Sequence, residues 1–193
     1  MQLTVLQWWE VLAVVLAIAY LVLAIRQNIW CWAAAAISTL LYLFIMYRAN
    51  LYMESVLQLF YLVMAGYGWY EWRHGGKGGT QLQVSTWPAR YHAIAIASVF
   101  VLVFVSGELL SRYSDAALPF LDSLTTWGAV VATFMVTRKI LENWIYWFVI
   151  DAVSIVLYLS RDLYFTAALF AAYLVMIVFG YRSWRASMKQ ATA

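Results

Sequence analysis

Residues 138–158 read RKILENWIYWFVIDAVSIVLY, an apolar segment that begins with two cations and carries an aspartate deep inside. A charged side chain at the centre of a membrane helix costs about 2.5–3.5 kcal/mol on insertion scales, so this aspartate needs a reason. Polar and aromatic residues recur through the segment at Asn143, Trp147, Asp151, Ser154 and Tyr158. At the helical period these positions share one face. Such a stripe indicates a lined cavity in a membrane protein and favours transport.

The composition is that of an integral membrane protein. Of the 193 residues, 66% are hydrophobic and 11% charged, and the mean hydropathy is +0.78. A soluble domain averages about 45–50% apolar and about 25% charged residues. The net charge is only +3 and the cations lie at segment ends, so no nucleic-acid partner is expected. The N-terminal MQLTVLQWWE lacks a basic region and a cleavage site, so no cleaved signal peptide is expected.

The lone cysteine, Cys31, has no partner for an internal disulfide and no His or Cys neighbours at metal-ligand spacing. We therefore expect no metal and no cofactor.

Seven apolar runs are long enough to cross a bilayer as helices, which takes about 20 residues. They lie at roughly 9–25, 29–47, 52–70, 91–110, 119–137, 143–160 and 163–181. Nine cations fall on one side of these runs, and Arg48, Arg112 and Arg161 fall on the other. The positive-inside rule then predicts an outside N-terminus and a cytoplasmic C-terminus. The fold class expected is an all-α membrane protein with seven transmembrane helices.

The chain also contains an internal repeat. At an offset of 112 residues the third run matches the seventh, with Gly68 on Gly180 and Trp72-Arg73 on Trp184-Arg185. The second run aligns with the sixth when Asn28 and Trp32 are placed on Asn143 and Trp147 and, after one inserted residue, Ser38 is placed on Ser154. The apolar bias of membrane helices is the alternative explanation for these matches.

A duplication predicts a three-helix repeat at 9–70, a linker helix at 91–110 and a second repeat at 119–184, within one membrane domain of 1–193. Units that begin four crossings apart point the same way, which gives a parallel 3+1+3 arrangement. Transporters with such repeats bind substrate near the midplane, where the repeats meet.

The motifs in this layout resemble the PnuC family of vitamin transporters. They are ESVLQLFYLVMAGYGWYEW (54–72) and TRKILENWIYWFVIDAVSIVLY (137–158), supported by LYFTAALFAAYLVMIVFGYRSW (163–184). The resemblance implies a SWEET-like 3+1+3 fold and facilitated diffusion of nicotinamide riboside, with trapping by cytoplasmic phosphorylation. It also implies a homotrimer in the bacterial inner membrane, surrounded by membrane lipid.

At two positions this sequence has an acidic residue that differs from some members that carry nicotinamide riboside. Glu54 and Asp151 stand where those members have small or amide residues. Relatives in the same fold carry thiamine or riboflavin. Nicotinamide riboside and thiamine are both aromatic cations, so two carboxylates suit either, and the substrate stays open.

The candidate substrate contacts begin with the stripe. Trp144 and Trp147 can stack on a cationic ring, and Asn143 can hydrogen-bond a carboxamide or a ribose hydroxyl. Asp151 can face the positive charge, and Tyr158 completes the stripe. The alternatives are an interfacial aromatic belt for the tryptophans, a helix cap for Asn143 and helix packing for Asp151.

Other candidates lie on the third and fifth runs. Glu54, Gln58 and Tyr61 share one face of the third run, with Glu54 near the outer mouth and Gln58 deeper. Thr133 and Trp127 on the fifth run are weaker candidates.

An inner gate is expected at Arg138, Lys139 and Glu142, and Arg138 and Glu142 are spaced to pair across one helical turn. The alternative is ordinary cationic flanking of a membrane helix.

Two other classes compete with transport. An intramembrane enzyme needs two carboxylates meeting mid-membrane or a buried histidine, and a seven-helix retinal receptor needs a lysine within its last span. HGGKGGT lacks the spacing of a Walker A loop, so ATP coupling is not expected. We expect no enzyme, and a passive transporter that rocks one three-helix bundle against the other.

Overall fold

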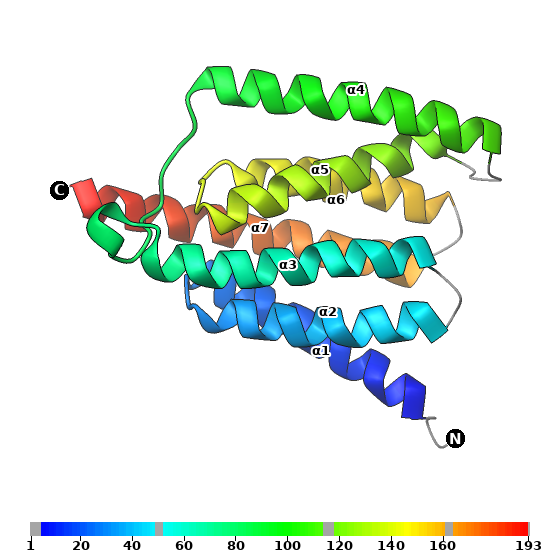
Figure 1. Ribbon diagram of the computed structural model, residues 1–193, viewed down its shortest axis with the longest axis horizontal. Coiled ribbons are helices and arrows are strands. Elements are labelled where there is room, and N and C mark those ends of the chain that lie inside the picture. Colours follow the sequence, from blue (N-terminus) through cyan, green and yellow to red (C-terminus); the bar gives the residue numbers. More distant parts are fainter. Residues whose placement is uncertain (1–4, 49–51, 114–117, 161–163, 193) are drawn as a thin grey trace. The chain divides into compact units, whose positions relative to one another are not determined.

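The computed structural model describes residues 5–48, 52–113, 118–160 and 164–192. Its helices are α1 (Val5–Ile25), α2 (Trp30–Arg48), α3 (Tyr52–His74), a 3-10 turn η1 (Lys77–Gly79), α4 (Ala89–Tyr113), α5 (Pro119–Thr137), α6 (Asn143–Leu159) and α7 (Tyr164–Thr192). Each predicted apolar run falls on one of the seven α-helices (Figure 1). The all-α expectation is confirmed.

By length and hydropathy, three of the described helices could each cross a bilayer. Ala89–Tyr113, Pro119–Thr137 and Ala167–Gln190 are long and apolar enough to cross a bilayer. Val11–Ile25, Trp30–Ile45 and Asn143–Leu159 are shorter apolar stretches. At about 1.5 Å per residue, the 17 residues of α6 extend over roughly 26 Å, slightly less than a hydrocarbon core of about 30 Å.

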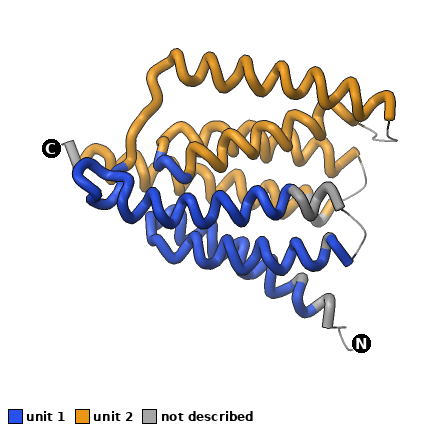
Figure 2. The backbone as a smooth tube through the Cα atoms, viewed as in Figure 1, with its two compact units in different colours: residues 1–83, 137–139 blue, residues 84–136, 140–193 orange. Residues whose placement is uncertain are grey.

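The chain divides into two compact units (Figure 2). The first comprises Met1–Gln83 with Thr137–Lys139, and the second comprises Val84–Val136 with Ile140–Ala193. Helices α1 to α3 therefore form the first unit, and the linker helix α4 groups with α5 to α7. In addition, the last residue of α5, Thr137, and the two residues that follow it belong to the first unit.

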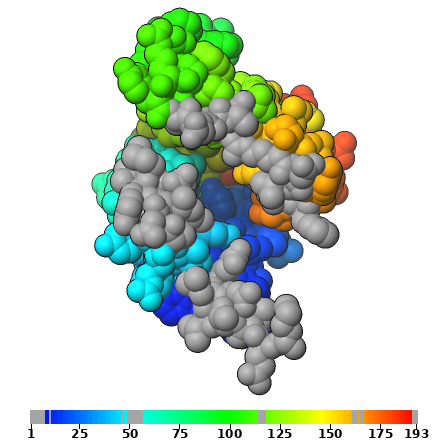
Figure 3. Space-filling model, turned by 90° about the vertical axis from the view of Figure 1, so that its right-hand side faces the viewer, coloured from blue at the N-terminus to red at the C-terminus, as the bar shows by residue number. Residues whose placement is uncertain are grey.

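Each unit has its own packing. In the first, α2 packs against both α1 and α3, and Ser38 Oγ donates to the Ala13 carbonyl at 2.8 Å. In the second, α6 packs against α7. Helix α4 is held to α5 because Trp127 Nε1 donates to Ser106 Oγ at 3.1 Å. The atoms of α4, green in Figure 3, accordingly lie next to those of α5.

A tryptophan on a glycine joins the last two helices of each repeat. Trp32 of α2 packs against Gly68 of α3, and Trp144 of α6 packs against Gly180 of α7. A Cβ atom at either glycine would overlap the indole ring. Glycine is therefore required for the close approach of these helices.

In both repeats a second tryptophan packs against the first. The rings of Trp32 and Trp72 meet edge-on, with centroids 5.4 Å apart at 84°. Trp144 and Trp184 meet at 5.4 Å and 88°. All three pairs of equivalent residues, including the two glycines, are 112 positions apart.

The turns that precede α2 and α6 follow the same offset. Gln27 and Lys139 have positive φ angles of 53° and 48°. The Asn28 amide donates to the Leu23 carbonyl at 2.9 Å, and the Ile140 amide donates to Met135 at 2.9 Å. The turn that follows α1 therefore has the same form as the turn that follows α5.

One predicted alignment is wrong by three residues. The structure pairs Trp32 with Trp144 rather than with Trp147, and Asn28 with Ile140 rather than with Asn143. No inserted residue is needed. The physical reason is that successive tryptophans one helical turn apart match equally well in sequence, and only the glycine on the next helix distinguishes them.

We predict that Gly68→Ala lowers the stability of the first unit. The new methyl group would overlap the Trp32 ring, and overpacking of this kind costs about 1–3 kcal/mol. Thermal unfolding in detergent measures the effect. The matched control is Gly66→Ala, two residues away on α3, where a Cβ meets nothing within 4 Å. Equal unfolding temperatures for the two variants would contradict the proposed contact.

Candidate functional site

Helix α6 has two chemically different faces. Its exposed face is apolar, and Val149, which is 54% exposed, is representative. Asn143, Asp151 and Ser154 are buried, with Asp151 only 4% exposed. At the helical period these three residues lie opposite Val149. The predicted stripe is therefore a buried polar face.

Asp151 is the most unusual group on this face. Within the described part of the chain, its carboxylate has no hydrogen bond and no ion pair. Burial of a carboxylate without a partner is costly, and in a membrane helix such a group marks a functional position. The arrangement can accept a cation or a hydrogen-bond donor.

Asn143 and Trp144, at the start of α6, hold further free polar atoms. Asn143 Nδ2 donates to the Ile140 carbonyl at 2.6 Å. Its Oδ1 atom and Trp144 Nε1 are buried without a hydrogen-bond partner among the described residues. Trp32 Nε1, the equivalent of Trp144 Nε1, is in the same condition. These atoms can bind a polar ligand.

Trp147 and Tyr158 are half-buried on the same side of α6. The ring of Tyr158 packs against Phe170 of α7, with centroids 5.0 Å apart. On α5, Thr133 is buried. The Trp127 indole N–H donates to Ser106 Oγ of α4, so this donor already has a partner.

The candidates on α3 belong to the first unit. Gln58 and Tyr61 are half-buried, and Tyr61 packs against Phe60 with ring centroids 5.5 Å apart. Glu54 lies in α3, but its side chain is outside the described part of the structure.

The predicted gate residues fall into two groups, the first of which surrounds Arg138. Arg138 Nη1 lies 2.8 Å from Glu71 Oε2 and donates to the Tyr67 hydroxyl at 3.2 Å. The hydrogen bond with Tyr67, assisted by the charge of Glu71, raises the pKa of Arg138. The turn after α5 is thereby bound to the end of α3.

Lys139 is buried beside Arg138 in the first unit. Its Nζ donates to Gln27 Oε1 at 3.3 Å and lies 4.5 Å from the centroid of the Trp72 ring. Gln27 and Lys139 occupy the same position in the two repeats, 112 residues apart. Burial lowers the pKa of Lys139 from 10.5 to about 8.

Glu142 belongs to a different group, in the second unit. Its Oε2 accepts a hydrogen bond from the Trp87 amide at 3.3 Å, and the Leu141 amide donates to the Ser85 carbonyl at 2.8 Å. The spacing of Arg138 and Glu142 suggests a pair, but Arg138 instead pairs with Glu71.

Sequence reasoning missed four members of the Arg138 and Lys139 group, namely Gln27, Tyr67, Glu71 and Trp72. A signal was present, because the YGWYEW motif places Tyr67 and Glu71 one helical turn apart.

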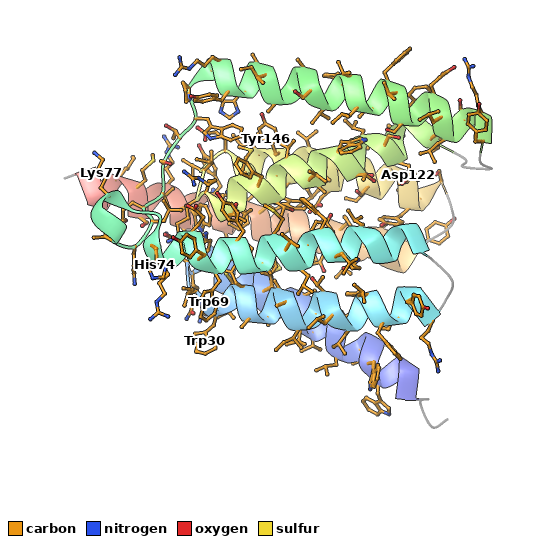
Figure 4. All side chains as sticks on the ribbon, viewed as in Figure 1. Trp30, Trp69, His74, Lys77, Asp122 and Tyr146 are labelled. Atoms are coloured by element: carbon orange, nitrogen blue, oxygen red, sulfur yellow. The ribbon has the colours of Figure 1, made fainter. Side chains whose placement is uncertain are left out.

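No metal centre is found in the described ranges, which contain no group of three His, Cys, Asp or Glu side chains close enough to hold an ion. His92 instead forms a hydrogen bond with Tyr146 (labelled in Figure 4), with 3.0 Å between His92 Nδ1 and the Tyr146 hydroxyl oxygen.

The described helices form two units with matching tryptophan–glycine contacts, and α6 carries a buried polar stripe. A sequence profile described as nicotinamide mononucleotide transporter matches residues 7–186. The chain belongs to this transporter family. It is an integral membrane protein of the PnuC type, and the family resemblance expected from the motifs is confirmed.

Individual relatives of this family member differ in their cargo. The riboflavin/roseoflavin transporter RibM of Streptomyces davaonensis is 26% identical over 182 residues, which is 92% of this chain and 84% of that protein. The nicotinamide riboside transporter PnuC of Escherichia coli is 23% identical over 210 residues, covering 96% and 88%. The PnuC protein of Neisseria mucosa is 26% identical over 195 residues, covering 95% and 74%.

A solved structure supports the same family fold. The crystal structure of the vitamin B3 transporter PnuC superposes with a TM-score of 0.73 at 25% identity, covering 95% of this chain and 83% of that one. The fold that the family resemblance implied is therefore confirmed.

We predict that Lys139 makes the stability of this family member depend on pH. Its folded pKa of about 8 lies below the ordinary 10.5, so the folded protein binds the proton less tightly than the unfolded chain. The resulting penalty is full below about pH 8 and disappears as the pH rises to 10.5. Thermal unfolding between pH 7 and 9.5 should therefore show wild type gaining stability relative to Lys139→Met.

The control for this experiment is Lys77→Met, because Lys77 is exposed in η1. It should follow the wild-type profile. Parallel profiles for wild type and Lys139→Met would show that Lys139 titrates normally.

Proposed function

We propose that this chain is a facilitative transporter of nicotinamide riboside, which a cytoplasmic kinase then traps by phosphorylation. The observation that carries the proposal is the buried carboxylate of Asp151, which has no partner among the described residues and lies on the same face of α6 as Trp147. The pyridinium ring of nicotinamide riboside is an aromatic cation. A carboxylate can balance its charge, and an indole face attracts it by cation–π interaction.

The remaining candidates supply polar contacts in this proposal. The free Asn143 Oδ1 and the Trp144 indole N–H suit the carboxamide and ribose hydroxyls. A site that leaves its buried polar atoms unpaired without substrate gains selectivity for a substrate that pairs them.

A second cargo has an observation in its favour. RibM, named as a riboflavin transporter, is similar to this chain over most of both proteins. Riboflavin is neutral, however, and would leave the Asp151 charge unbalanced. Thiamine is an aromatic cation like nicotinamide riboside, so the carboxylate alone does not discriminate between these two.

The transport cycle is proposed to be passive. The turn after α5 forms the inner gate, closed by the ion pair of Arg138 with Glu71 and by the contacts of Lys139. Rearrangement of the two repeats opens it without ATP or ion coupling. The protein is proposed to be a homotrimer of the bacterial inner membrane, with the N-terminus outside and the C-terminus in the cytoplasm. The nine cations on one side support this orientation.

Asp151→Asn is predicted to weaken nicotinamide riboside binding by roughly tenfold to a hundredfold, the effect of removing about 1.4–2.8 kcal/mol of charge interaction. Thiamine binding should fall in the same way, whereas riboflavin binding should not. Calorimetric titration of the purified protein with each vitamin provides the measurement.

Asp122→Asn is the matched control, because Asp122 lies in the first turn of α5 (Figure 4). Unchanged affinity for both cations in Asp151→Asn would overturn the assigned role. Tight riboflavin binding without cation binding would replace the cargo and leave the family assignment intact.

In liposomes that contain only the transporter, labelled nicotinamide riboside should reach the external concentration and stop. Enclosing a riboside kinase and ATP should produce accumulation, because phosphorylation removes the free substrate. Accumulation above the external concentration without the kinase would rule out passive transport. Liposomes carrying Asp151→Leu serve as the control for leakage.

A further inference from the structure

We propose that the second repeat carries a binding site for an anionic phospholipid, in a groove between α6 and α7. The groove has a volume of about 290 Å³ and is lined on α6 by Ile145 and Phe148 and on α7 by Ile177 and Val178. Arg182 and Arg185 line the same groove. One acyl chain would occupy the apolar part, and the headgroup phosphate would lie at the two arginines.

The groove opens to the surroundings of the helices. Ile145 is 50% exposed, Phe148 is 44% exposed and Val178 is 40% exposed. Lipid tails are as apolar as these side chains, so an acyl chain can contact them in the membrane. Its volume is just below the range of about 300–1,000 Å³ typical of pockets that enclose a small molecule. A chain-like ligand that extends beyond the groove fits better than an enclosed vitamin.

The two arginines provide the charge. They are three residues apart on α7, so they lie on one face of the helix, and both are exposed. Within the described residues, neither guanidinium has an ion pair or hydrogen bond with the protein. They lie beyond the apolar part of α7, at the cation-rich end of the chain. Guanidinium groups bind phosphate through paired hydrogen bonds, and basic pockets between membrane helices bind anionic headgroups.

The first repeat shows that this groove is not an automatic product of the duplication. At the offset of 112, Ile145, Phe148, Ile177, Val178 and Arg182 correspond to Ala33, Ala36, Ala65, Gly66 and Tyr70. Of the two arginines, only Arg185 has an arginine equivalent, Arg73.

The tyrosine beside these arginines also differs between the repeats. Tyr181 corresponds to Trp69, which packs edge-on against Trp30 with centroids 5.5 Å apart (Figure 4). The large apolar lining and the paired arginines are therefore specific to the second repeat.

Native mass spectrometry of the full-length protein tests the proposal, with phosphatidylglycerol and phosphatidylethanolamine of identical acyl chains as probes. Wild type should retain phosphatidylglycerol in preference to phosphatidylethanolamine, and the double variant Arg182→Gln/Arg185→Gln should lose on the order of tenfold or more of that preference. Higher ionic strength should weaken it. Arg73→Gln, the matched control from the first repeat, should keep it.

Val178→Trp separates the acyl chain from the charge, because it fills the groove and leaves both arginines in place. It should reduce phosphatidylglycerol retention, and inorganic phosphate should not displace the lipid. Full displacement by phosphate would show a simple anion site and overturn the proposal. Unchanged phosphatidylglycerol retention in the double variant would also overturn the proposal. So would a wild-type protein that binds no lipid and a Val178→Trp variant that loses its oligomers, because the groove would then be an interface between copies of the chain. Circular dichroism and gel filtration confirm that each variant is folded.

Discussion

The packing of an indole ring on a glycine is the contact on which the rest of this structure depends. Trp32 on Gly68 and Trp144 on Gly180 allow two membrane helices to approach closely in each repeat. Small residues at helix contacts serve this purpose in membranes, where the hydrophobic effect does not drive helices together. The second tryptophan of each repeat then packs edge-on against the first.

This register determines which residues of α6 are presented for function. Once Trp144 packs against α7, the helical period places Val149 and its neighbours outward and leaves Asn143, Asp151 and Ser154 buried. The same contact brings apolar residues of α6 and α7 together in the groove that Arg182 and Arg185 also line. A single packing contact thus positions a buried carboxylate on one side of the helix and an open groove on another.

The sequence predicted the fold because that depends on local properties. Apolar runs of sufficient length must be helices in lipid, and the Gly68 and Gly180 matches revealed the duplication. The stripe on α6 was also predictable, since it needs only the helical period. Trp32 was aligned wrongly because its register depends on a glycine in another helix. Glu71 was missed as the partner of Arg138 because a tertiary contact joins residues far apart in sequence.

The central claim is that Asp151 balances the charge of an aromatic cation inside the membrane. An experimental structure of the protein bound to nicotinamide riboside tests it most directly. The account predicts the pyridinium ring within contact distance of the Asp151 carboxylate, with the Trp147 indole beside it. A bound pyridinium ring far from α6, with Asp151 paired to a protein side chain instead, would contradict the claim.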